Sequence, residues 1–94
     1  MSDRITRKHL EALADLLNIA TNSPPQSWTK TAEGPRANIG NFYISGANGG
    51  FCLHRMHNED GGVTTPLSMG HIPARDLCNQ MRAYLSGIEL GQSL

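Results

Sequence analysis

The most constraining feature of this sequence is the dipeptide Asn48-Gly49, which separates two runs of β-prone residues. A type I′ turn requires positive φ at both central positions, and Asn-Gly is the pair that adopts it most readily. Residues 41–47 and 50–56 are therefore predicted to form a β-hairpin around this turn. The expected register pairs Ala47 with Gly50, Gly46 with Phe51, Ile44 with Leu53, and Phe42 with Arg55.

The two faces of this hairpin differ in chemistry, because successive side chains of a strand point to opposite sides. The face expected to meet the core carries Phe42, Ile44, Phe51 and Leu53, with Arg55 at its end. The second face carries Asn41, Tyr43, Ser45, Cys52, His54 and Met56. Two interpretations of this second face stay open: a site for a ligand or a partner chain, or the solvated side of an antiparallel sheet.

A helix is predicted before the hairpin, from Ile5 to Ala20. Thr6 is expected to cap its N-terminus, and apolar residues recur along it at helical spacing: Leu10, Leu13 and Leu17. The prolines that follow end this helix, because proline removes a backbone donor. Residues 23–37 are expected to be a polar connecting loop, whose single tryptophan, Trp28, plugs the edge of the core.

A third strand and a second helix are predicted after the hairpin. Val63-Thr64-Thr65 follows a glycine-rich turn and stops at Pro66. A loop over residues 68–72 leads into a helix that begins near Pro73 and carries the apolar stripe Leu77, Met81, Tyr84, Leu85 and Ile88. Ser86-Gly87 is predicted to cap this helix, and residues 91–94 are predicted to fray.

Together these elements predict one α+β domain over residues 1–94, in the order α-β-β-(β)-α. Because both helices and the hairpin have one apolar side, the simplest packing lays both helices on the apolar face of the hairpin. The expected architecture is a two-layer sandwich.

Composition narrows the range of functions. Eight Lys and Arg residues balance eight Asp and Glu residues, so nucleic acid is not the expected partner, since phosphate neutralisation supplies most non-specific affinity. We expect neither a signal peptide nor a membrane span. Cys52 and Cys78 lie in apolar-patterned segments, which favours buried free thiols in a reducing cytoplasm. An exposed strand edge and a modest core favour a homo-oligomer.

Neither metal binding nor catalysis is predicted. Cys52, His54 and His57 are metal-ligand types, but alternation on a strand turns His57 away from the other two. Cys52 and His54 stand side by side without a third group to orient them. The glycine-rich segments open no helix followed by Lys and Ser or Thr, so they are turns and not phosphate loops. We therefore expect no cofactor and no enzyme.

A set of polar side chains remains as candidates for binding. An arginine fork, imidazoles and a tyrosine suit an anionic aromatic ligand such as a nucleotide. Arg55 has three alternatives: to extend into water, to pair with a carboxylate such as Glu59 or Asp76, or to reach a ligand, and the ion pair is favoured. The candidate ligand- or partner-binding residues are Tyr43, Ser45, His54, Arg55, His57, Asn58, Glu59, His71 and Arg75.

Short motifs over most of the chain carry a resemblance to a known family: Arg36-Ala-Asn-Ile-Gly-Asn41, Ser45-Gly-Ala47, Gly49-Gly50, Leu53-His-Arg55, Asn58-Glu59, Gly61-Gly-Val63, Gly70-His-Ile72 and Arg75-Asp-Leu77. On these motifs the chain resembles a family of small uncharacterised proteins encoded by tailed phages and prophages. This chain departs from the family pattern at position 48. The family pattern has an aromatic residue before Gly-Gly, whereas this chain has Asn48. The resemblance brings no activity and no assigned site residues.

What the resemblance implies is an origin in phage and, by genomic context, a class of function. Small phage accessory proteins of this length frequently block a host defence complex, as anti-CRISPR proteins do, or sequester a nucleotide immune signal. The implied function is a non-enzymatic binding protein that counters host defence or modulates a host factor. The alternatives are a nucleic-acid-binding regulator, a direct protein inhibitor of a defence complex and, last, a small metal-dependent or Cys/His hydrolase.

Overall fold

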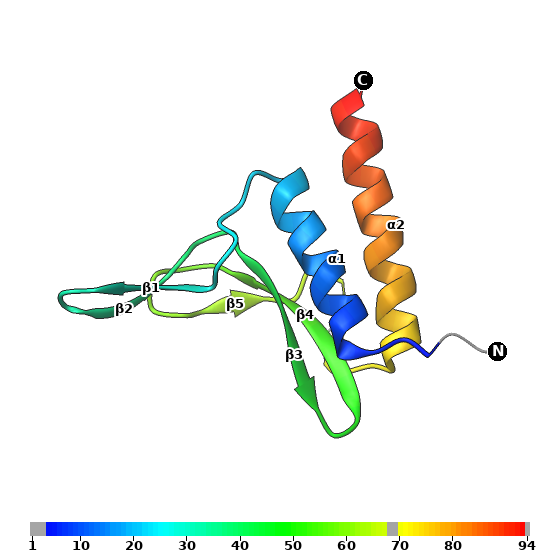
Figure 1. Ribbon diagram of the computed structural model, residues 1–94, viewed down its shortest axis with the longest axis horizontal. Coiled ribbons are helices and arrows are strands. Elements are labelled where there is room, and N and C mark those ends of the chain that lie inside the picture. Colours follow the sequence, from blue (N-terminus) through cyan, green and yellow to red (C-terminus); the bar gives the residue numbers. More distant parts are fainter. Residues whose placement is uncertain (1–3, 68–69, 94) are drawn as a thin grey trace.

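The computed structural model describes residues 4–67 and 70–93, which form two helices and two antiparallel sheets (Figure 1). In chain order the elements are α1 (Arg7–Ala20), β1 (Trp28–Thr31), β2 (Gly34–Ala37), β3 (Phe42–Ala47), β4 (Gly50–Met56), β5 (Val63–Thr64) and α2 (Ala74–Ser93). One sheet has the order β3-β4-β5, and the other is the β1-β2 pair. The predicted α+β class and element order are confirmed, and β1-β2 is an additional sheet.

The β3-β4 hairpin has the predicted register. Its strands pair from Phe42 opposite Arg55 to Ala47 opposite Gly50. Asn48 and the glycine that follows it have φ values of 50° and 76°, as a type I′ turn requires. The apolar side chains of both strands therefore point to one face, as the sequence predicted.

Both helices cover that apolar face, with α1 against β3 and α2 against β4 (Figure 1). The rings of Phe42 and Tyr84 meet edge to face with centroids 6.1 Å apart. Burying one large apolar side chain stabilises the fold by about 1.5–3 kcal/mol, so this layer provides most of the stability. The buried core consists of Leu10, Ala14, Leu17, Phe42, Ile44, Leu53, Leu77, Cys78 and Met81.

Two buried asparagines add specific polar contacts to this packing. The Phe42 amide donates to Asn18 Oδ1 at 2.7 Å, and Asn18 Nδ2 donates to the Phe42 carbonyl at 3.1 Å. Asn41 Nδ2 donates to the Pro24 carbonyl at 2.8 Å, and its Oδ1 accepts from Ser27 at 2.7 Å. Buried polar groups need such partners, so these contacts fix α1 and the following segment against the outer edge of β3.

Residues 23–37 are not the continuous loop that the sequence predicted. β1 and β2 pair around the two-residue loop Ala32-Glu33 and form a hairpin that projects from the body (Figure 1). Trp28 is 46% exposed and lies outside the main core, so the expectation that it plugs the core edge is wrong. Its ring instead packs against Gly61, where an added Cβ would come within 2.7 Å of it.

The second helix does not end at Ser86-Gly87 but continues to Ser93. A glycine inside a helix costs only about 1 kcal/mol relative to alanine, which the packing of neighbouring apolar residues on the core offsets. Gln92 also donates a hydrogen bond to the Ala20 carbonyl, which ties the end of α2 to the end of α1. Of the fraying expected over residues 91–94, the first three residues are helical and the last lies outside the described residues.

Two further expectations concern the cysteines and the membrane. Cys52 and Cys78 are both buried and form no disulfide, as predicted. Cys78 belongs to the core under the helices, whereas Cys52 lies on the other side of β4. No helix within the described ranges is long and apolar enough to cross a membrane.

Candidate functional site

Four of the predicted binding residues meet on the side of the β3-β4 hairpin that faces away from the helices. Tyr43 on β3 and His54 on β4 are register partners. Their ring centroids are 5.2 Å apart, and the Tyr43 hydroxyl lies 3.5 Å from His54 Nδ1. Ser45 and His71 complete the group. These four residues are called the Tyr43 cluster below.

His71 joins the Tyr43 cluster from a segment that pairs with the outer edge of β4. Ile72 exchanges two backbone hydrogen bonds with Phe51, at 2.8 and 2.9 Å. From this edge, His71 Nε2 reaches Ser45 Oγ at 3.2 Å, and its ring centroid lies 6.4 Å from that of His54. The predicted loop over residues 68–72 therefore contributes to the sheet at Ile72, while residues 68 and 69 lie outside the described part.

The same arrangement buries Cys52, which the sequence placed on the open face. Cys52 is the register partner of Ser45, so a His71 side chain that reaches Ser45 from the far edge crosses β4 over the thiol. Gly50 leaves room for this crossing, because an added Cβ would lie 3.1 Å from the backbone of residues 71 and 72. Asn41 and Met56 of this face are buried as well, so only part of the predicted polar face is accessible.

The surroundings of Tyr43 and His54 favour the uncharged form of both side chains. Burial lowers the pKa of His54 below its ordinary value, and the nearby His71 lowers it further. Burial raises the pKa of Tyr43, with a smaller contribution from Cys52. At neutral pH, His54 is an uncharged imidazole and Tyr43 an uncharged phenol. The pair is therefore an aromatic surface with hydrogen-bonding tips and carries no charge of its own for an anion.

Arg55 does not belong to this cluster. Its Nε donates to the Gly40 carbonyl at 3.1 Å, and its guanidinium lies 4.6 Å from the centre of the Phe42 ring. The expectation that Arg55 forms an ion pair with Glu59 or Asp76 is therefore wrong. Within the described residues, the ion pairs join Arg7 to Glu11 and Arg36 to Glu59.

Asn58 and Glu59 belong to the turn between β4 and β5. The Asn58 carboxamide oxygen accepts the amides of Asp60 and Gly62 at 3.0 and 2.9 Å, which closes the turn. Glu59 lies 3.7 Å from Arg36 Nε at the surface. Both side chains hold local structure, and the structure does not bring them to the Tyr43 cluster.

His57 lies with Arg55 beside a separate hollow at the end of β4. The hollow has a volume of about 290 Å³ and is lined by Ile39, Gly40, Arg55, Met56, His57 and Thr64. A guanidinium and an imidazole are groups that bind anions, although one Arg55 donor is already used within the fold. Arg75, the last predicted residue, is exposed in the first turn of α2.

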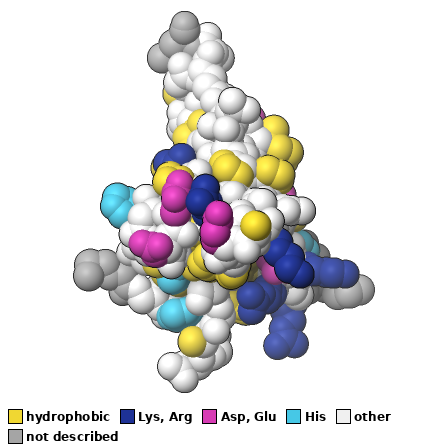
Figure 2. Space-filling model, turned by 90° about the vertical axis from the view of Figure 1, so that its left-hand side faces the viewer, with side chains coloured by type: hydrophobic (Ala, Val, Ile, Leu, Met, Phe, Trp, Pro, Cys, Tyr) yellow, Lys and Arg dark blue, Asp and Glu magenta, His cyan; other side chains and the backbone are white. Residues whose placement is uncertain are grey.

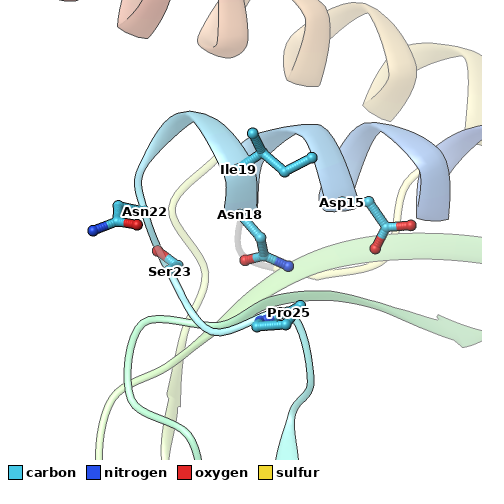
Figure 3. A pocket seen from close by; sticks show the side chains of 6 residues that line it. All are labelled: Asp15, Asn18, Ile19, Asn22, Ser23 and Pro25. Atoms are coloured by element: carbon cyan, nitrogen blue, oxygen red, sulfur yellow. The ribbon is translucent and has the colours of Figure 1, made fainter.

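A larger hollow of about 370 Å³ lies at the C-terminal end of α1 (Figure 3). Figure 3 shows Asn18 pointing toward the strands, where it binds Phe42, and Ile19 pointing the opposite way, toward α2. The hydroxyl of Ser23 is 2.6 Å from that of Thr21. The side chains of Asn18 and Ser23 already form hydrogen bonds within the fold, so they offer little for recognition of a ligand in this hollow. It is lined by Asp15, Asn18, Ile19, Asn22, Ser23 and Pro25.

Across residues 4–67 and 70–93, no three His, Cys, Asp or Glu side chains are placed to hold a metal ion. The Cys52 thiol is buried, and its Sγ lies 3.7 Å from the Leu53 carbonyl oxygen. A nucleophile must be reached by its substrate, and burial keeps a thiol in this position away from solvent.

Comparisons of the chain with protein-family models, with curated proteins and with solved structures found no match. The properties of the site therefore rest on the side chains described above.

Sequence reasoning missed the β1-β2 hairpin and the large apolar side chains exposed near its base. Trp28, Ile39 and Val63 are all exposed in this part of the molecule. The β-prone run Trp28-Thr-Lys-Thr31, which two residues separate from a glycine, was a usable hairpin signal. Pro35 obscured it, because proline is confined to strand edges and is usually taken to mark a loop.

Proposed function

We propose that this chain is a non-enzymatic binding protein of phage origin, whose Tyr43 cluster docks on a host protein. Through this contact it counters host antiviral defence or modulates a host factor in the cytoplasm of the bacterial host. The observation that carries the proposal is the meeting of Tyr43, Ser45, His54 and His71 on one accessible surface outside the core.

The composition of this surface supports recognition of a protein. Tyrosine and histidine each combine an apolar ring with a polar tip, and tyrosine is enriched among residues that dominate binding energy. Tyr43 and His54 stand on paired strands, and His71 is held by its contact with Ser45. Side chains fixed in this way lose little conformational entropy on binding, which favours affinity.

The shape of the site also supports a macromolecular partner. Small ligands are held in concave pockets that bury most of their surface. Among the hollows lined by described residues, those at the end of α1, near Arg55 and between the helices contain no residue of the Tyr43 cluster. The hollow along β3 includes Tyr43 alone of the cluster and has a volume of about 140 Å³, which is small for a drug-sized ligand. The residues of the Tyr43 cluster are half-buried or, for His71, exposed, so a protein surface can cover them together.

The test is capture of a host protein by the immobilised wild-type chain, followed by titration of the purified partner. We expect Tyr43→Ala to weaken binding at least about tenfold, the loss typical of a central aromatic contact. Thr29→Ala, an exposed change on β1, is the matched control and should leave the dissociation constant unchanged. Equal affinity of wild type and a folded Tyr43→Ala variant would rule out this surface.

A biological readout complements the titration. Expression of the wild-type chain should raise the plating efficiency of phage on a host that carries the targeted defence, and Tyr43→Ala should remove the gain. If the captured partner has no role in defence, the same variant should instead abolish the change in that partner's activity. Unaltered plating and unaltered partner activity together would contradict the proposal.

A second candidate is sequestration of a nucleotide at the hollow lined by Arg55 and His57. A guanidinium and an imidazole in one concave site suit a phosphate group. Native mass spectrometry of protein purified from its bacterial host tests this directly, since a nucleotide-sized adduct should be lost on denaturation. His57→Ala should reduce the adduct, whereas a bare chain mass would dismiss this candidate and leave the protein-binding proposal standing.

A further inference from the structure

The outer side of the helical layer exposes several large apolar side chains. Leu16 is 47% exposed, Ile19 76% and Leu90 64%. Figure 2 shows hydrophobic side chains gathered on the upper part of the molecule, where the helices lie. Single apolar residues are common on protein surfaces, but a gathered set marks an interaction surface.

A groove separates the C-terminal halves of the two helices on this side. It is a hollow of about 240 Å³ lined by Leu16, Ile19, Ala20, Leu85, Glu89 and Gln92. At 1.5 Å per residue, the 20 residues of α2 span about 30 Å and the 14 of α1 about 21 Å. α2 therefore projects beyond the end of α1 (Figure 1), with Gln92 near its C-terminus hydrogen-bonded to the Ala20 carbonyl at the end of α1.

Two opposite charges lie on one side of α2, and one of them, Glu89, lines this groove. Arg82 and Glu89 are both exposed, and a spacing of seven residues places them on the same side of a helix, two turns apart. Leu85 lies between them on the groove side. Neither charge takes part in an ion pair within residues 4–67 and 70–93.

We propose that a second copy of this chain covers the groove, with the two α2 helices antiparallel about a two-fold axis beside Leu85 and Ser86. In an isologous interface the two-fold axis repeats every contact. Where residue i of one copy meets residue j of the other, residue j of the first copy also meets residue i of the second. An axis midway between Arg82 and Glu89 places Arg82 against the partner's Glu89, and Glu89 against the partner's Arg82. The exposed Leu16 and Ile19 then flank the partner's helix.

The self-complementary charges favour a second copy over an unrelated partner. A helix with one cation and one anion on its contact side matches itself only when the second helix runs antiparallel. Of the two side chains beside the axis, Ser86 is small and exposed, and Leu85 is half-buried on the groove side. The formal net charge of zero opposes association less than a large charge would.

This dimer does not rest on the proposed function, because its surface lies on the helical layer and the Tyr43 cluster lies on the opposite side of the sheet. Both Tyr43 clusters remain exposed in the dimer. A dimer therefore presents two identical binding surfaces that point in opposite directions, and it gains avidity for a partner that is itself repeated.

The test is the mass of the chain in solution, measured by sedimentation velocity across rising protein concentration. Wild type should reach twice the 10.2 kDa chain mass. Glu89→Arg and Arg82→Glu each create two like-charge contacts and should raise the dimer dissociation constant at least about tenfold. The double charge swap Arg82→Glu with Glu89→Arg should restore the wild-type value. Glu33→Arg, the same charge change in the exposed β1-β2 loop, should have no effect.

Three outcomes would overturn the proposal. The first is a wild-type chain that stays monomeric at every concentration, which would leave the groove for another occupant. The second is a dimer that both single reversals leave intact. The third is a folded double swap that fails to dimerise. Circular dichroism verifies folding of each variant, and Tyr43→Ala should keep the dimer whatever its effect on partner binding.

Discussion

The two hairpins of this protein have the same strand pairing and loop length, but they differ in the tertiary contacts that stabilise them. Both β1-β2 and β3-β4 are antiparallel pairs joined by two-residue loops. The apolar face of β3-β4 is covered by both helices, so Phe42, Ile44 and Leu53 are buried. β1-β2 projects from the body (Figure 1), and its strand residues are exposed or half-buried except Ala37 at its base.

This contrast shows that a hairpin in this protein is stabilised mainly by its contacts with the rest of the fold. An isolated two-stranded hairpin is marginal in water, because its turn and hydrogen bonds barely offset the loss of chain entropy. β3-β4 gains the missing free energy from buried side chains. β1-β2 depends on its base, where Trp28 packs on Gly61, the Ala37 amide donates to the Glu59 carbonyl at 3.0 Å, and the Asn38 amide donates to the Ser27 carbonyl at 2.8 Å.

The largest expected effect comes from removing one aromatic ring from each hairpin in turn. Phe42→Ala should lower the free energy of unfolding by about 3–5 kcal/mol, because the ring is buried under both helices. Trp28→Ala should cost about 1 kcal/mol, since nearly half of this side chain is already in water. Urea unfolding of both variants measures the contrast, and equal losses would refute it.

An intermediate effect is expected at the base of β1-β2. Gly61 has a φ of 97°, and its added Cβ would meet the Trp28 ring. Gly61→Ala should therefore cost about 2 kcal/mol, from backbone strain and displacement of the ring together. Gly34→Ala is the control, because Gly34 has a φ of 114° with open space around it and should cost about 1 kcal/mol. If the two losses are equal, the Trp28 contact does not support the hairpin.

The smallest effect is a pH dependence confined to β3-β4. Burial lowers the pKa of His54 below its ordinary 6.5, so the unfolded chain binds a proton more readily than the folded one. The free energy of unfolding therefore has its full value above pH 6.5, the ordinary pKa of a histidine. It decreases as the pH falls below 6.5 toward the lowered pKa of His54 in the folded chain. The melting temperature should decrease more in wild type than in His54→Gln over this window. Parallel curves would show that His54 does not titrate in this way.

β1-β2 contains no histidine, so it offers an internal comparison for this titration. Amide hydrogen exchange resolves the two hairpins, because each backbone amide reports the opening of its own strand. β3-β4 amides should lose protection as His54 gains its proton, relative to those of β1-β2. Equal changes in both hairpins would point to global unfolding without a specific contribution from His54.

The sequence predicted the elements whose burial follows a regular period. Alternation around Asn48-Gly49 gave the register of β3-β4 and its core face, and the helical stripes gave the sides of α1 and α2 that pack on it. It failed for β1-β2, because exposed strands carry no alternation of apolar and polar residues. The sequence-based prediction also ended α2 too early, at Ser86-Gly87. A glycine in the sequence indicates a helix end, and the tertiary packing that lets the helix continue cannot be read from the residues around it.

The candidate site was predicted in part, for a physical reason. Tyr43, Ser45 and His54 share a face of the hairpin by strand alternation, so their proximity follows from the register alone. His71 could only be listed as one polar residue among others, because its position depends on the pairing of Ile72 with Phe51. Arg55, Asn58 and Glu59 had suitable chemistry, yet the fold uses their side chains in other contacts.

Local chemistry by itself therefore determined the turn, the strand register, the sides of the helices and the α+β class of this protein. Tertiary structure alone decided how much of the polar face of β3-β4 is accessible, because on this face Cys52 is buried and His71 reaches Ser45 from another segment of the chain. It also decided the role of Arg55, whose hydrogen bond to Gly40 and stacking on Phe42 replaced the expected carboxylate. Period and turn preference act between near neighbours in sequence, whereas burial and partner choice depend on residues that only the folded chain brings together.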